Sequence, residues 1–336
     1  MNTYNPMVAL LVFFGVILVL YFIFNPKNGL FFKYLKARKE TEKTAIEDIL
    51  KLLYHDPKTS INTIFDELDF SHSLLLESID TMLETGLIQK EHELFSLTND
   101  GDEYALRIVR AHRLWEKYLS EKTGFHKTEW HRRAEKKEHE LSGEEVENLS
   151  TLLGNPRYDP HGDPIPTKAG KIPKKKGMLL ADLPILNFGK IIHIEDEPTS
   201  IYKQILAQHI HLHSQVYMKE ISENRIVFES EGEQFVLSPI VAKNITVISL
   251  DKADVIEKDT MRLSNLENNQ KATIIGVSKE CRGENRRRLL DLGFVKGATV
   301  SIDLLNPLGD PKAFLIKGTA IALRKDQAVK ILITKA

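Results

Sequence analysis

The chain has 336 residues, a formal net charge of −1 and one cysteine, Cys281. This length predicts two or three domains, and the near-neutral charge gives no global reason to expect a polyanionic partner. A single cysteine excludes an intrachain disulfide, and the balance of hydrophobic (42%) and charged (28%) residues excludes a wholly disordered chain.

The first segment is strongly apolar. Residues Met7 to Phe24 read MVALLVFFGVILVLYFIF, without charge or proline, which nears the length of a transmembrane helix. A cleaved signal peptide is the competing interpretation, but no Lys or Arg precedes the run and bulky residues end it. Basic residues follow the run, so we expect an anchor at 1–26, a basic juxtamembrane segment at 27–42, and cytoplasmic domains on a single-pass protein of the cytoplasmic membrane.

Residues 43–105 show the pattern of a winged helix-turn-helix, namely a helix, a helix-turn-helix and a hairpin. Ser71 or Ser73 is expected to cap the recognition helix. The hairpin strands are expected around Leu87–Gln89 and Leu94–Leu97. The candidate DNA-binding positions on the recognition helix are Ser71, Ser73, Leu74, Leu76 and Glu77.

Two later stretches carry His and Glu at helical spacing. The candidates are His112 and Glu116 in RAHRLWEKYL, and His131, Glu135, Glu138 and His139 in WHRRAEKKEHELS. The last four fall within an arc of roughly 100° on a helix. For either stretch alone, solvated side chains are the better interpretation. The two together favour a divalent-metal site with nitrogen and oxygen ligands.

The rest of the chain divides by composition. The proline-rich GNPRYDPHGDPIP ends a helical segment at 106–166, and the basic TKAGKIPKKKG indicates a linker at 167–178. Two β-rich segments follow, at 179–255 and 261–336. Each has a strand, a helix and several further strands, which predicts two small, partly open β-barrels.

Three histidines stand close together in the first β-rich segment. A helix fits Ser200–Gln208, and His209, His211 and His213 then alternate at strand spacing. Alternation predicts that the three share one face of a strand. We favour a structural face over an accessory metal patch.

At this point the chain resembles the diphtheria-toxin-repressor family of metal-dependent transcriptional regulators. The likeness is carried between Ala111 and Pro166 by AHRLWEKYL, WHRRAEKKEHELSGEEVENL and GNPRYDPHGDPIP. The terminal segment resembles another module, the small domain named after the ferrous-iron transport protein FeoA, through RRRLLDLGFVKGATV and IKGTAIALRKDQAVKILI. With the apolar run, the resemblance implies a multidomain α+β protein. Its expected parts are a transmembrane helix, a winged helix-turn-helix, a helical dimerisation and metal-binding domain, and two small FeoA-like β-barrels.

The resemblance implies two metal sites. His112, Glu116 and His131 match the family's first site, whereas Glu135, Glu138 and His139 match its second. Asp48, on the first helix of the winged domain, falls where the family places one further ligand. An oxygen-rich donor set favours Fe(II) or Mn(II) over a tetrahedral thiolate zinc site.

Two positions depart from the family pattern near these sites. Lys51 stands where some manganese-sensing relatives have a carboxylate. The acid and amide that complete the first site in relatives fall near Pro198 and Ile201, so Glu195 and Glu197 are considered as replacements.

The implied function is a homodimeric, DNA-binding repressor of metal-uptake genes, tethered to the membrane and not an enzyme. The recognition helix differs from this expectation, because no Lys or Arg lies between Lys58 and Lys90. The alternative is therefore a metal-sensing regulatory subunit of a membrane metal transporter, without sequence-specific DNA binding. A metal-activated hydrolase is a weaker third hypothesis, since the sequence has no recognisable substrate pocket or phosphate loop.

Overall fold

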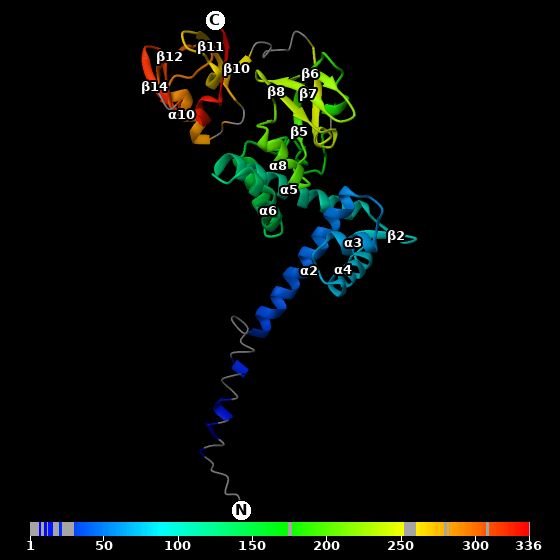
Figure 1. The fold of residues 1–336 in the computed structure, drawn as a ribbon. Helices are drawn as coiled ribbons and strands as arrows, with labels where there is room; N and C mark the ends of the chain where they lie inside the picture. The colour runs from blue at the N-terminus through cyan, green and yellow to red at the C-terminus, as the bar shows by residue number, and fades with distance from the viewer. Residues whose placement is uncertain are drawn as a thin grey trace, which may run out of the picture. The chain divides into compact units, whose positions relative to one another are not determined.

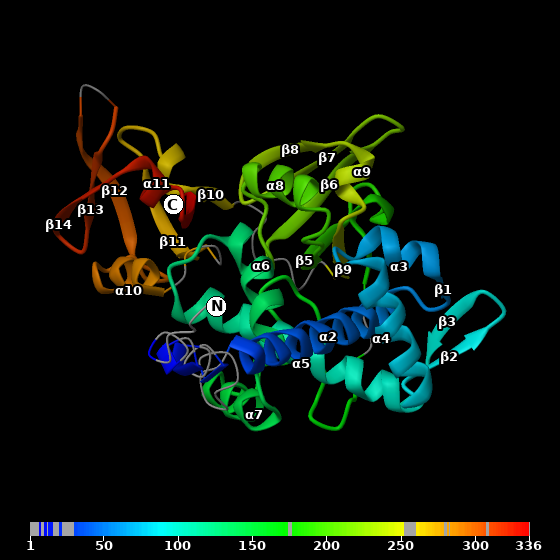
Figure 2. The same ribbon diagram turned by 90° about the horizontal axis from the view of Figure 1, so that it is seen from below.

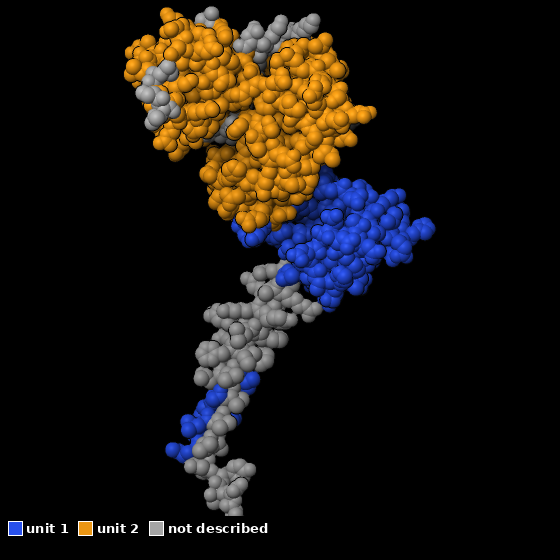
Figure 3. Space-filling model, viewed as in Figure 1, with its two compact units in different colours: residues 1–111, 136–143, 168–170 blue, residues 112–135, 144–167, 171–336 orange. Residues whose placement is uncertain are grey.

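The computed structural model describes residues 30–335 except 174–176, 252–259, 279–280, 282 and 307–308, and only Met7, Leu10, Leu11, 13–15, Leu20 and Tyr21 before them. For residues 30–40 and Leu305 it describes the backbone alone. The chain divides into two compact units, which are coloured separately in Figure 3. Unit 1 comprises residues 1–111, 136–143 and 168–170, and unit 2 comprises 112–135, 144–167 and 171–336.

The predicted membrane anchor requires correction. In the part of the chain that the structure describes, no helix has both the length and the apolar composition needed to cross a membrane. Most of Met7 to Phe24 lies outside the described residues. The prediction of a single-pass membrane protein rested on the apolar composition of that run alone and is wrong by this finding.

Unit 1 contains a winged helix-turn-helix. Its elements are α2 (Leu30–His55), β1 (Thr59–Ser60), α3 (Ile61–Glu67), α4 (His72–Glu84), β2 (Ile88–Glu91) and β3 (Leu94–Leu97). The strands pair in the order β1-β3-β2, and the β2–β3 hairpin lies beside α4 (Figure 2). Ile49 and Leu53 of α2 pack with Ile64 of α3 and Leu75 of α4 in one buried core. Apolar residues at helical spacing thus form this core, as the sequence pattern predicts.

Three helices follow the hairpin. They are α5 (Asn99–Lys122), α6 (Lys127–Glu138) and α7 (Gly143–Leu152). Because α6 ends at Glu138, His139 lies one residue beyond the helix on which the sequence places it.

A tight loop at 156–166 follows α7. The Asp159 Oδ1 atom accepts hydrogen bonds from the backbone N–H groups of His161, Gly162 and Asp163, each at 2.8 Å. Gly162 has φ +101, and a Cβ atom there would lie 2.1 Å from the carbonyl oxygen of Ile192. A left-handed backbone and a close approach to β5 together require glycine at this position.

The two β-rich segments each form a six-stranded antiparallel sheet (Figure 1). The first has the strand order β4-β9-β5-β6-β7-β8. Its elements are β4 (Met178–Leu179), η1 (Leu180–Asp182), β5 (Phe188–Ile194), α8 (Thr199–Ala207), β6 (Gln215–Ile221), β7 (Ile226–Ser230), β8 (Glu233–Leu237), α9 (Pro239–Ala242) and β9 (Ile245–Leu250).

The second sheet has the order β10-β15-β11-β12-β13-β14. Its elements are β10 (Thr260–Arg262), η3 (Leu263–Asn265), β11 (Lys271–Val277), α10 (Gly283–Asp291), β12 (Thr299–Leu305), β13 (Lys312–Ile316), β14 (Thr319–Leu323), α11 (Lys325–Ala328) and β15 (Ile331–Lys335). Among the described residues, no pairing joins the two edge strands of either sheet, so each segment predicted as a small, partly open β-barrel forms an open six-stranded sheet. The edge strands β4 and β10 have only two and three residues, which offers few backbone groups for closure.

The three alternating histidines do not form a strand. They lie between α8 and β6, and His209 and His213 have φ values of 54° and 71°. His211 is buried whereas His213 is exposed. Positive φ values reverse the chain direction locally, which removes the shared face that strand alternation predicts.

A buried ion pair joins the two sheets within unit 2. The Arg262 Nη2 atom lies 2.7 Å from Glu231 Oε2, and both side chains are almost completely buried. The Arg262 Nη1 atom donates to the carbonyl oxygen of Val329 at 3.0 Å. Arg262 is the last residue of β10 in the second sheet, and Glu231 lies in the β7–β8 turn of the first.

We expect Gly162→Ala to lower the free energy of unfolding by roughly 2–4 kcal/mol, because strain at positive φ adds to the clash with Ile192. Urea unfolding of the two proteins measures the difference. Gly124→Ala is the control, since nothing lies within 4 Å of a Cβ atom there. Equal stability of both variants would contradict the tight packing of this loop on β5.

Candidate metal centres

The predicted ligands fall into two clusters, one in each unit. In unit 2, His112 and Glu116 lie on α5, and His131 lies on α6. The Glu116 Oε1 atom is 3.3 Å from His112 Nε2 and 3.5 Å from His131 Nδ1. One potential ligand atom from each of the three residues lies within 4.8 Å of the others. Helical spacing on α5 and the packing of α6 on it therefore bring together the three residues that the sequence predicts as ligands of the first site.

Glu116 is the centre of this first cluster. Its side chain is about 2% exposed, and its Oε1 atom has no hydrogen-bond partner in the described structure. A buried carboxylate oxygen without a hydrogen bond is costly unless a cation compensates it. A dication in contact with this oxygen and the two imidazoles would remove that cost.

Residues from two other segments complete the surroundings of the first cluster. Asp196 Oδ2 and Glu197 Oε1, from the turn after β5, each lie 3.2 Å from a ring nitrogen of His131. His161 Nδ1, from the 156–166 loop, lies 3.5 Å from Glu116 Oε2. Glu135 Oε1 lies 3.4 Å from His131 Nε2, so Glu135 joins this cluster rather than the second one to which the resemblance assigned it.

The charge balance of this cluster depends on protonated imidazoles. In the described structure, all ion pairs of Glu116, Asp196 and Glu197 are with histidines. Burial alone would raise the pKa of Glu116, but the charges of His112 and His161 outweigh it and hold that pKa well below its usual value. Burial would lower the pKa of His131, yet its hydrogen bonds to carboxylates, Asp196 first, raise it far above its usual value. Protons here occupy the place that a divalent cation would take.

The second cluster lies in unit 1 and joins α2 to the end of α6. One potential ligand atom each of Asp48, Glu138 and His139 lies within 4.8 Å of the others. His139 Nε2 is 3.2 Å from Asp48 Oδ1, and His139 Nδ1 is 2.7 Å from Glu47 Oε2. Burial opposes the charged form of His139, but hydrogen bonds to Asp48 and Glu47 raise its pKa to about 9.

Lysine side chains supply further positive charge in the second cluster. The Lys51 amino group donates to both carboxylate oxygens of Glu138, at 3.0 and 3.3 Å, and the Glu138 side chain is fully buried. The Lys43 Nζ atom lies 3.5 Å from Glu47 Oε1. Three carboxylates thus face two ammonium groups and one imidazole. A dication that binds Glu138 must share it with Lys51 or displace the lysine.

The candidate DNA-binding residues lie on the first half of α4 and just before it. Ser71 caps this helix by accepting a hydrogen bond from the N–H group of Leu74 at 3.4 Å. Ser71, Ser73, Leu76 and Glu77 are exposed, and Leu74 is half-buried. Leu76 is 44% exposed, so the helix presents an apolar side chain to solvent beside an acidic one.

Several residues of these clusters were missed by sequence reasoning. Glu47 precedes the predicted Asp48, and Asp196 lies between the two glutamates considered for the first site. His161 belongs to the DPHGDP motif, whose prolines predict the end of a helical segment but no particular contact. One potential ligand atom of Asp159 also lies within 4.8 Å of ligand atoms of Glu116 and His161. Burial raises the pKa of Asp159 to about 7.

Comparison with known proteins identifies two regions of the chain. Residues 98–167 match the family described as iron dependent repressor, metal binding and dimerisation domain, and residues 261–335 match the FeoA domain. The first match includes all the predicted ligands except Asp48.

Curated relatives resemble different parts of the chain. A probable metal transport system membrane protein of Chlamydia trachomatis is 32% identical over 178 residues, which cover 49% of this chain and 39% of that protein. The iron-dependent repressor IdeR of Mycobacterium tuberculosis is 32% identical over 31% of this chain and 45% of the repressor. An Fe(2+) transport protein A/FeoB fusion protein of Porphyromonas gingivalis is 41% identical over 21% of this chain and 8% of the fusion. The chain spans less than half the length of these relatives.

Among solved structures, a manganese-dependent transcriptional repressor in complex with manganese is 29% identical, with a TM-score of 0.56. The match covers 61% of this chain and 99% of that repressor. The manganese regulator SloR is 25% identical, with a TM-score of 0.51 and similar coverage.

We expect the apparent affinity for Mn(II) to rise with pH. A ligand imidazole must be neutral, whereas a pKa of about 9 keeps His139 protonated at neutral pH. The ion-pair stabilisation from His139 in the metal-free protein is complete below its ordinary pKa of about 6.5 and is lost as pH rises through about 9. Calorimetric titration at about pH 6.5, 7.5 and 8.5 should show affinity increasing up to about tenfold per unit for each proton displaced. A pH-independent affinity without proton release would contradict this assignment.

Lys51→Met should strengthen metal binding at the second cluster and destabilise the metal-free protein. Removal of one partner of a buried ion pair costs about 3–5 kcal/mol, and a dication recovers part of that cost. We therefore expect a gain in apparent Mn(II) affinity of about tenfold or more and a larger metal-induced rise in Tm. Lys90→Met is the control, because Lys90 is half exposed and pairs with Glu93 in the β2–β3 hairpin instead. Equal gains in the two variants would show that Lys51 does not compete with metal.

Proposed function

Because residues 98–167 form a domain of the iron-dependent repressor family and residues 261–335 form a FeoA domain, we propose that the chain is a metal-activated transcriptional regulator. It represses genes of metal uptake when its metal sites are filled. Fe(II) or Mn(II) is the activating ion, and the active species is a homodimer bound to DNA.

The buried Glu116 carboxylate carries this proposal. Three imidazoles converge on it, and one of its oxygens lacks a hydrogen bond. The donor atoms are imidazole nitrogens and carboxylate oxygens, without a thiolate, and this set suits Fe(II) and Mn(II). The similar proteins support the same two metals, since they include an iron-dependent repressor and a manganese-dependent repressor in complex with manganese.

The proposed holders of the metal are assigned by cluster. His112, Glu116 and His131 hold the first ion, with Asp196 or Glu197 as further ligand. Asp48, Glu138 and His139 hold the second, and Glu135 belongs with the first. A bound ion supplies positive charge that replaces ligand protons, and so favours the arrangement in which its ligands lie together.

Metal at the second cluster also acts on the winged helix. Asp48 lies on α2, whose residues Ile49 and Leu53 pack in the same core as Leu75 of α4. An ion held by Asp48 and by the end of α6 therefore restrains the domain that carries α4. Metal favours DNA binding only to the extent that it binds the DNA-binding conformation of the protein more tightly than the other conformations.

The decisive experiment measures metal-dependent DNA retention by the full chain. We expect Mn(II) or Fe(II) to increase retention of DNA from upstream of its own gene at least about tenfold over a scrambled sequence, at a fixed salt concentration. Glu116→Gln should lose most of this metal response, because the amide removes the central negative charge. Glu121→Gln, on the same helix but partly exposed, is the matched control. No metal-dependent preference for any upstream sequence would reject the regulator proposal.

A second candidate function is supported by specific similarities. The matches to a probable metal transport system membrane protein and to a fusion with the transporter FeoB favour a regulatory module for a metal transporter. The exposed Leu76 and Glu77 on α4 also fit a protein partner better than a phosphate backbone.

Co-purification of the tagged chain with membrane metal transporters, with and without Mn(II), separates the two functions. Metal-dependent recovery of a transporter together with absent DNA retention would favour the second candidate. Absence of any transporter at either metal level would reject it.

A further inference from the structure

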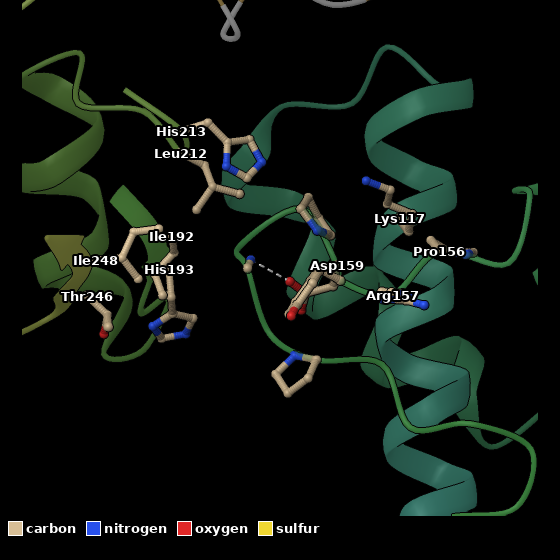
Figure 4. Close-up of a pocket in the computed structure, with 14 residues that line it drawn as sticks. Lys117, Pro156, Arg157, Asp159, Ile192, His193, Leu212, His213, Thr246 and Ile248 are labelled. Carbon is tan, nitrogen blue, oxygen red and sulfur yellow. Dashed lines mark hydrogen bonds between the residues drawn. The ribbon is translucent and has the colours of Figure 1, made fainter. Parts of the chain in front are cut away.

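A cavity of about 490 Å³ lies in unit 2, and none of the proposed metal ligands lines it (Figure 4). It is bounded by the 156–164 loop, by α5, by the strands β5 and β9, and by the turn before β6. Its volume is within the range of small-molecule sites. The proposed metal function leaves this cavity without a role.

The cavity has apolar walls and a cationic edge. The apolar side chains come from both sides of the space and are Pro156, Pro160, Pro164, Ile192, Leu212 and Ile248. The cationic edge is formed by Lys117 and Arg157. Two imidazoles also line the cavity, those of His213 and of His193, and the latter is paired with Asp163 at 3.0 Å. Figure 4 shows Lys117 extending from α5 and His213 and His193 on the opposite side, with the loop between them.

Asp159 is the only carboxylate among the lining residues, and its charge is already engaged. Its Oδ1 atom accepts three backbone N–H groups at 2.8 Å each. Lys117 lies 3.2 Å from Glu121 in a partly exposed helical pair, which is weak in water and readily exchanged. The charge of the lining is therefore complementary to an anionic group attached to an apolar body.

We propose that this cavity binds an amphipathic organic anion, namely a carboxylate attached to an apolar body, for which decanoate is the probe. The apolar body lies against Ile192, Leu212 and Ile248, where it leaves water. The carboxylate lies beside Lys117 and Arg157, with charge-assisted hydrogen bonds to both.

The same loop links this cavity to the first metal cluster. His161 reaches Glu116 from one side of the loop, and Pro160 and Gly162 line the cavity from the other. A ligand that shifts the loop changes the position of His161, so anion and metal binding are coupled reciprocally. This coupling, unlike the cavity itself, rests on the proposed metal function.

Calorimetric titration of decanoate into the full chain tests the cavity. Decanoate should bind, and decyltrimethylammonium should bind at least about tenfold more weakly, because the edge of the cavity is cationic. The double variant Lys117→Met/Arg157→Met removes the cationic edge without touching the apolar walls, and Ile248→Trp fills the space. Each should weaken decanoate binding about tenfold or more. Ile240→Trp is the matched control, since Ile240 is 67% exposed and does not line the cavity.

Absence of decanoate binding, equal affinity in all variants, or equal affinity for the cationic analogue would overturn the proposal. Titrations repeated with Mn(II) test the coupling. Equal decanoate affinity with and without bound Mn(II) would overturn the coupling and leave the cavity supported. Decanoate binding by a chain that binds no Mn(II) would overturn the metal function alone.

Discussion

The burial of one carboxylate, that of Glu116, is the constraint on which the centre of this molecule depends. Its negative charge lies among three imidazoles contributed by α5, α6 and the loop after α7. These segments can pack together only while positive charge is present between them, because an uncompensated buried carboxylate is costly. The metal-free arrangement meets this requirement with protons. The packing of α5, α6 and the DPHGDP loop therefore depends on the positive charge, from protons or from a metal ion, that neutralises Glu116.

The two clusters meet the same requirement in different ways. In the first, protonated histidines balance the carboxylates, with Asp196 and Glu197 added from the turn after β5. In the second, Lys51 holds Glu138 directly. Metal binding would therefore displace protons at the first cluster, whereas at the second it would displace the proton of His139 and also compete with the Lys51 ammonium group. This difference would separate the responses of the two clusters to metal concentration.

Sequence patterns predicted what depends on local spacing. Helical repeats indicated α3 to α6, the part of α2 from residue 43 onward, and the pairing of His112 with Glu116. Such patterns could not predict tertiary contacts. His161 and Asp196 lie near Glu116 and His131 only because loops from separate segments of the chain pack together. Strand alternation failed at His209 and His213, where positive φ values turn the backbone. The sequence predicted partly open barrels, but each segment forms an open sheet, because strand order and the pairing of the edge strands depend on tertiary packing. The apolar composition of residues 7–24 was likewise an insufficient guide to a spanning helix.

The contact between the two sheets includes a buried charge, the guanidinium of Arg262. Its charge is balanced by Glu231, which belongs to the other β-rich segment. The sequence places the domain boundary between the two, at residues 256–260. Cutting the chain at that boundary leaves an orphan cation on one fragment and an orphan anion on the other. The terminal module is consequently not an interchangeable appendage, and any relative that carries it on a different protein needs another acid to receive this arginine or a neutral residue in its place.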